Sequence, residues 1–170
     1  MSINLRPHLL ETLQRLSQHF NIGVFTAASE HYANKVINEI DPEGKTILFR
    51  LFRDHCFIKN SNEKIKDLRV LEGINLEKTI LIDNSPYSAL YQKDNLVPIL
   101  PFTNDEKDDQ LRKVCDYLLM YFGKNEGNFQ EVIKNHFRLR EYEKFSTVKE
   151  LIDKLYSDFI WTCALKQGVI

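Results

Sequence analysis

The sequence has 170 residues, of which 43% are hydrophobic and 11% aromatic, values typical of a folded domain with its own core. Lysine and arginine number 23 against 24 aspartates and glutamates, so no overall positive field attracts nucleic acid. No apolar run is long enough to span a membrane, and the widely spaced Cys56, Cys115 and Cys163 are expected to be reduced thiols of an intracellular protein.

The first hundred residues alternate between two hydrophobic patterns. Apolar residues at helical spacing predict helices over 6–20, 29–40 and 64–72. Short apolar runs between them predict strands over 21–27, 46–52, 79–83 and 96–100. Strands and helices that alternate in this way indicate an α/β fold, with a doubly wound parallel sheet covered by helices on both faces.

From residue 107 onward the pattern is helical. An apolar stripe predicts a helix that ends at Gly123, and a second helix is expected after Asn128. A third is predicted from the capping box that Thr147 and Glu150 form. We therefore expect an α/β domain over 1–122 and a helical extension over 124–170.

Polar residues follow two of the predicted strands. Thr26 ends the run "IGVFT", and Asp83 and Asn84 end the run "TILIDN". Ligands of doubly wound sheets bind beyond the carboxyl ends of the strands, and Lys66 could reach the same crevice from a loop. Thr26 could donate to a phosphoryl oxygen, Lys66 could neutralise its charge, and Asp83 could bind Mg²⁺. Taken singly, the same residues also suit a helix cap, a solvated charge and a turn.

The segments "FTAASEHYAN", "LFRDHC", "IKDL", "ILIDNSP" and "DNLVPI" resemble, in order and spacing, the small carboxy-terminal-domain phosphatases of the haloacid dehalogenase superfamily. This resemblance covers about residues 5–120. It implies Mg²⁺-dependent hydrolysis of phosphoserine or phosphothreonine in a phosphoprotein through an aspartyl-phosphate, and a nuclear or mitochondrial location. It also implies the roles of six residues: Thr26 and Lys66 in catalysis, Tyr32 and Arg53 at the substrate, and Asp83 and Asn84 at the metal.

The sequence departs from this family at the first motif, D-x-D-x-T, which lies on a strand well before the "RP" found here at Arg6–Pro7. Five residues precede Arg6 and none is acidic. The nucleophilic carboxylate, the acid–base carboxylate and one Mg²⁺ ligand are therefore expected to be absent from this chain, which leaves groups that can at best bind. Asn34 is a lesser departure, because relatives usually carry aspartate there.

Two functions stay open. In the first, the chain is most of a phosphatase, inactive alone, whose first motif comes from another segment or chain. In the second, it is a pseudophosphatase that serves as a structural or interaction subunit. We expect Thr26, Lys66 and Asp83 to converge in either case.

We also expect the central sheet to be incomplete. Without the strand of the first motif, "IGVFT" and "TILID" would lie roughly 10 Å apart with unpaired backbone groups between them. A strand from another chain is favoured to fill this slot, over the C-terminal segment 159–170 or direct pairing of the two flanking strands.

Overall fold

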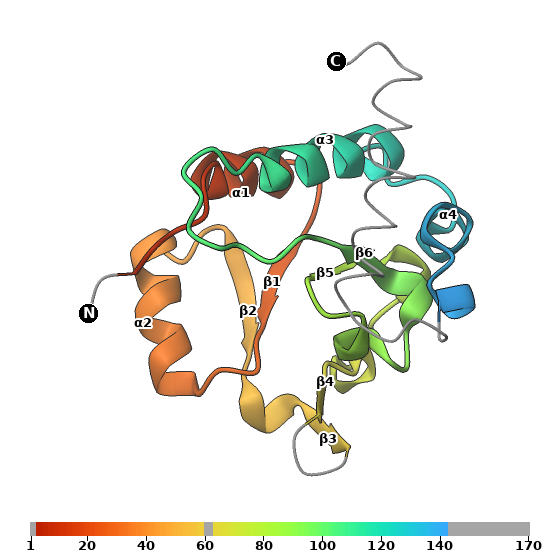
Figure 1. Ribbon diagram of the computed structural model, residues 1–170, viewed down its shortest axis with the longest axis horizontal. Coiled ribbons are helices and arrows are strands. Elements are labelled where there is room, and N and C mark those ends of the chain that lie inside the picture. Colours follow the sequence, from red (N-terminus) through yellow and green to blue (C-terminus); the bar gives the residue numbers. More distant parts are fainter. Residues whose placement is uncertain (1–2, 60–62, 143–170) are drawn as a thin grey trace.

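The computed structural model describes residues 3–59 and 63–142, which form an α/β structure with two parallel strand pairs, one antiparallel hairpin and four α helices (Figure 1). The α/β fold predicted from the sequence is confirmed. No helix in these two ranges has the length and apolar character needed to cross a membrane. The helix predicted from Thr147 and the third cysteine, Cys163, lie outside the described residues.

The first strand pair is built from the N-terminal third of the chain. It contains α1 (Leu9–Ser17), β1 (Ile22–Phe25), α2 (Glu30–Ile40) and β2 (Ile47–Leu51), and β1 and β2 pair in parallel. Apolar residues from α2 and β2 make a small core of their own: Ala33, Ile37, Ile47 and Phe52. The helix expected from residue 6 begins only at Leu9, because His8 adopts a left-handed conformation with φ of 64°.

The hairpin is where the sequence interpretation was wrong. The predicted helix over 64–72 is instead β4 (Glu63–Ile65), paired antiparallel with β3 (Phe57–Lys59), followed by a short 3-10 turn over Leu68–Val70. Backbone groups that a helix would use are bonded elsewhere. Those of β4 pair with β3, and the amide of Lys66 donates to the carbonyl of Ser88 at 2.7 Å. Tertiary partners therefore override the local helical pattern.

The second parallel pair consists of β5 (Leu81–Asp83) and β6 (Leu96–Pro98). Within the described part of the chain, β1 pairs only with β2 and β5 only with β6, so the two pairs form separate sheets. Direct pairing of β1 with β5, which would have closed the sheet, does not occur. The alternative in which the two flanking strands pair with each other is thus not seen among the described residues, and the strand that would lie between them stays a prediction.

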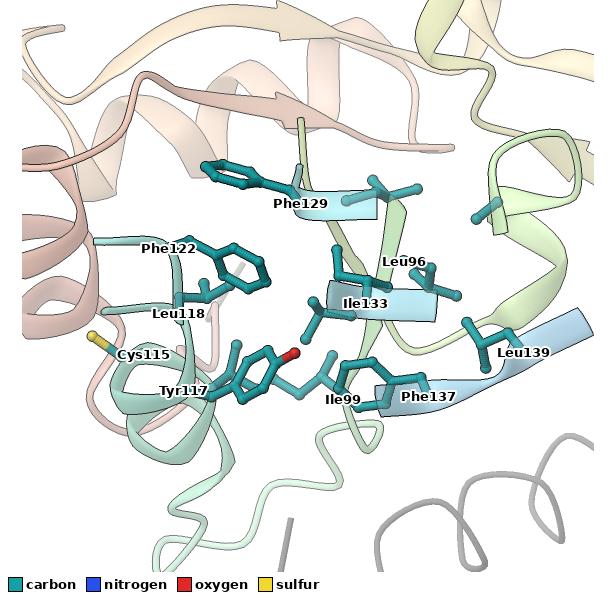
Figure 2. Close-up of a cluster of buried hydrophobic side chains, with 14 of the residues drawn as sticks. Leu96, Ile99, Cys115, Tyr117, Leu118, Phe122, Phe129, Ile133, Phe137 and Leu139 are labelled. Atoms are coloured by element: carbon teal, nitrogen blue, oxygen red, sulfur yellow. The ribbon is translucent and has the colours of Figure 1, made fainter. Parts of the chain in front are cut away.

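The main hydrophobic core joins β5 and β6 to α3 (Gln110–Phe122) and α4 (Phe129–Phe137). Figure 2 shows Phe122, Phe129 and Ile133 pointing into this core beside Leu96. The helix expected after Asn128 is α4, and the side chain of Asn128 caps it by accepting a hydrogen bond from the amide of Glu131 at 3.3 Å. The boundary placed between residues 122 and 124 stays a prediction, although α4 shares the core of the preceding strands.

Candidate functional site

The centre of the candidate site is an ion pair at the end of β5. The Nζ atom of Lys66 lies 2.5 Å from Oδ2 of Asp83, and the two side chains are only 16% and 6% exposed. Asp83 is the last residue of β5, and Lys66 directly follows β4. Two residues that were predicted to share a site are therefore in direct contact, although 17 positions separate them.

Local backbone bonds hold this pair in place. The amide of Ser85 donates to Oδ1 of Asp83 at 2.7 Å, which forms a tight turn directly after the strand. The amide of Ile99 donates to the carbonyl of Asp83 at 3.1 Å. Both carboxylate oxygens of Asp83 thus have partners from this chain, whereas the neighbouring Asn84 is exposed.

Thr26 and Arg53 meet at the turn after β1. The amide of Thr26 donates to the carbonyl of Leu51 at 2.9 Å, which continues the β1–β2 ladder by one residue, and its Oγ1 accepts from the amide of Ala28 at 3.1 Å. The Nε of Arg53 donates to the carbonyl of Ala27 at 3.0 Å. Thr26 lies within this turn and Arg53 binds to it, so both of these predicted site residues stabilise the same turn.

Two further residues singled out by the sequence lie on α2. Tyr32 is 43% exposed in the first turn of the helix. The side chain of Asn34 binds Arg50 of β2, because its Oδ1 accepts a hydrogen bond from Nη1 of Arg50 at 2.8 Å. The same guanidinium also donates to Asn38 at 2.8 Å, so Arg50 ties α2 to β2.

Sequence reasoning missed the position of Cys56. Its buried Sγ lies 3.9 Å from the carbonyl oxygen of Thr26. Burial raises the pKa of the Cys56 thiol, while the positive charges of Lys66, Lys64 and Arg53 act in the opposite direction. Cys56 therefore contacts the turn after β1, and the charges of Lys66 and Asp83 act on its thiol. We call this group the candidate site: Thr26, Arg53, Cys56, Lys66 and Asp83.

Among the described residues, the donor set for Mg²⁺ is incomplete. The described residues contain no group of three or more histidine, cysteine, aspartate or glutamate side chains that could hold a metal ion. Asp83 supplies one carboxylate, already engaged by Lys66 and Ser85, and Asn84 can supply an amide oxygen. Magnesium prefers six oxygen ligands in an octahedron, so these residues fit only part of a site.

The described residues thus form a parallel α/β structure with a lysine–aspartate pair at the end of β5. The family model for NLI interacting factor-like phosphatases matches residues 1–130. The chain therefore belongs to this family.

Similar proteins support the assignment. "CTD small phosphatase-like protein 3" of Caenorhabditis elegans is 36% identical over 148 residues, 86% of this chain and 50% of the relative. "CTD small phosphatase-like protein 2" of Dictyostelium discoideum is 43% identical over 113 residues, 66% of this chain and 19% of the relative. The chain thus spans half the length, or less, of these relatives.

Among solved structures, that of Fcp1, described as an essential RNA polymerase II CTD phosphatase, matches with a TM-score of 0.50 and 24% identity. The match covers 85% of this chain and 40% of the other. At this level of identity the likeness shows the fold and nothing finer.

Proposed function

We propose that this chain supplies the phosphate-binding part of a protein serine/threonine phosphatase and does not hydrolyse phosphate by itself. The observation that carries the proposal is the shielded contact between Lys66 and Asp83 at the end of β5. A lysine held there can neutralise the charge of a phosphoryl group, which is the main task of a phosphatase site around the transferred group. A phosphate group would compete with Asp83 for Lys66.

The other site residues have roles that follow from their positions. Thr26 ends β1 and would donate its hydroxyl hydrogen to a phosphoryl oxygen. Arg53 is exposed beside the same turn and, with the exposed Tyr32, would contact the polypeptide that carries the phosphate. Asp83 and Asn84 would be this chain's contribution to a bound Mg²⁺, which supplies charge neutralisation at the phosphate when present.

The proposed inactivity rests on the missing nucleophile. The printed residues contain no D-x-D-x-T motif, so no carboxylate is available to form the phosphoryl-enzyme bond. Cys56 does not replace it, because burial raises the pKa of its thiol and a cysteine nucleophile must be a thiolate. Catalysis would therefore need a segment in addition to residues 1–170.

The arrangement of the sheet supports a strand from outside the described residues. Each of β1 and β5 has one edge that pairs with no described strand, and Ile82 of β5 is 37% exposed. Open edges of this kind readily accept a further strand. A strand that carries the first motif, from another segment or another chain, would fill this place and bring its carboxylates next to Thr26 and Asp83.

One observation favours the alternative, a pseudophosphatase that acts as an interaction subunit. Both oxygens of Asp83 are satisfied by Lys66 and Ser85, so the site is a closed network that needs no ligand to be stable. In this case the open edges would bind a partner chain for assembly alone. The compartment stays a prediction in both cases.

The test is to assay purified 1–170 with Mg²⁺ on an aryl phosphate and to measure its binding to a phosphoserine peptide. We expect no turnover, and peptide binding that is weakened at least tenfold by Lys66→Met. Turnover that Asp83→Asn abolishes would show the inactivity to be wrong. Binding unchanged by Lys66→Met would refute the phosphate site.

A second arm separates the two functions. Co-expression with a segment that contains the first motif should restore turnover if the chain is part of an enzyme. Stable association of the segment without turnover would favour the pseudophosphatase.

A further inference from the structure

The β3–β4 hairpin places a second lysine beside the candidate site. In the antiparallel register, Ile58 lies opposite Lys64, so the two side chains share one face of the hairpin. Lys66 directly follows β4 and stands two positions after Lys64, so the alternation of side chains, continued by one residue beyond the strand, places it on the same side. The other face carries the pair Lys59 and Glu63, which lie opposite each other. The face that bears Lys66 therefore carries a second positive charge.

The surroundings of Cys56 agree with this assignment. Lys66, Lys64 and Arg53 act on its thiol as positive charges, and Asp83 acts on it as a negative charge. Lys64 therefore lies close enough to the candidate site to influence the same buried thiol as Lys66. A phosphate bound at Lys66 would leave Lys64 as a separate positive charge for another acidic group.

Lys64 is available for such a group. It is half-buried and makes no ion pair with any residue in the described ranges, whereas Lys66 pairs with Asp83 and the exposed Lys45 pairs with Glu43. The positive charge of Lys64 has no acidic partner in the described ranges, so an acidic group of a ligand could pair with it.

We propose that Lys64 is a specificity residue that binds an acidic side chain two positions away from the phosphorylated residue of a protein substrate. The spacing follows from the backbone: Lys64 and Lys66 are about 7 Å apart along an extended chain, which is also the distance between residues i and i+2 of an extended peptide. A residue one position from the phosphate would point away from the hairpin. This inference rests on the proposed binding of phosphate at Lys66.

The test compares four phosphoserine peptides for binding to chain 1–170 by fluorescence polarisation. One has alanines on both sides, two carry aspartate two residues before or after the phosphoserine, and one carries it directly after. We expect one of the two peptides with the longer spacing to bind about three- to fivefold tighter than the alanine peptide. The gain should shrink in 0.5 M salt, because screening weakens partly exposed pairs.

Two matched variants locate the effect. Lys64→Gln should remove the gain and leave affinity for the alanine peptide within about twofold, whereas Lys59→Gln, on the other face, should keep the gain. The inference is overturned if neither longer spacing gives tighter binding, if the gain survives Lys64→Gln, or if Lys59→Gln removes it equally. In these cases binding of the alanine peptide that depends on Lys66 would still uphold the proposed function. Absence of any peptide binding would refute both.

Discussion

The contributions of Lys66 and Asp83 to stability should be strongly coupled, because the two side chains form an ion pair. Its side chains are 16% and 6% exposed, so removal of one partner leaves the other charge almost without water. Breaking a shielded pair in this way costs about 3 kcal/mol. With a urea m-value of about 2 kcal/mol/M, Lys66→Met or Asp83→Asn alone should lower the unfolding midpoint by about 1.5 M.

The double variant, Lys66→Met with Asp83→Asn, separates the interaction energy of the two groups from the cost of each single substitution. When both charges are removed, no uncompensated charge stays behind, so its cost should fall short of the sum of the single costs by about 2 kcal/mol. The pair formed by Lys45 and Glu43 is a matched control, because its atoms are also 2.5 Å apart but its side chains are 79% and 68% exposed. There each single variant should cost less than about 0.5 kcal/mol.

The measurement is urea unfolding followed by circular dichroism for the wild type, the two single variants and the double variant of each pair. Costs at Lys66 and Asp83 that add within about 0.5 kcal/mol would refute the reasoning, because additivity means that the two groups do not interact. Equal coupling in the exposed control pair would also refute it, because burial would then not be the cause.

Two further variants test the core and the pH dependence. Phe129→Ala should lower the free energy of unfolding by about 3–5 kcal/mol, because Phe129 is only 1% exposed. The control Met120→Ala, at a position that is 49% exposed, should change it by less than about 0.5 kcal/mol. Similar urea midpoints for the two variants would place α4 outside the core. The Arg69 guanidinium lowers the pKa of Asp67 to about 2. The contribution of this carboxylate to the free energy of unfolding should therefore be fully present above about pH 4 and should be lost as the pH decreases towards 2. Asp67→Asn should flatten this part of the curve of unfolding midpoint against pH, while a slope as steep as that of the wild type would contradict the assignment.

Much of the secondary structure was legible in the sequence because its signals are local. The helical pattern from residue 107 predicts α3 and a helix after Asn128, where α4 begins, and short apolar runs predict β1, β2, β5 and β6. The hairpin was not legible, since residues 64–72 carry a helical pattern. It forms because β3 and the carbonyl of Ser88 bind the backbone of this segment. Both partners come from elsewhere in the chain.

For the candidate site, the sequence by itself determined the chemical types. Thr26 and Asp83 end apolar runs, and this position alone marks them as candidates for a ligand site. The proximity of Lys66 to Asp83, and of Cys56 to Thr26, was decided by the tertiary structure. No pattern of neighbouring residues encodes these distances, because they depend on how separate strands are placed.

The division of the strands into two sheets was likewise decided by the tertiary structure. Apolar content predicts that β1 and β5 are strands, but strands pair through backbone groups, which are nearly the same for every residue type except proline and so do not specify a partner. Which edges pair depends on the packing of the helices and loops around them. The sequence therefore determined what the strands are, and the folded chain determined that β1 pairs with β2, β5 pairs with β6, and the two pairs stay apart.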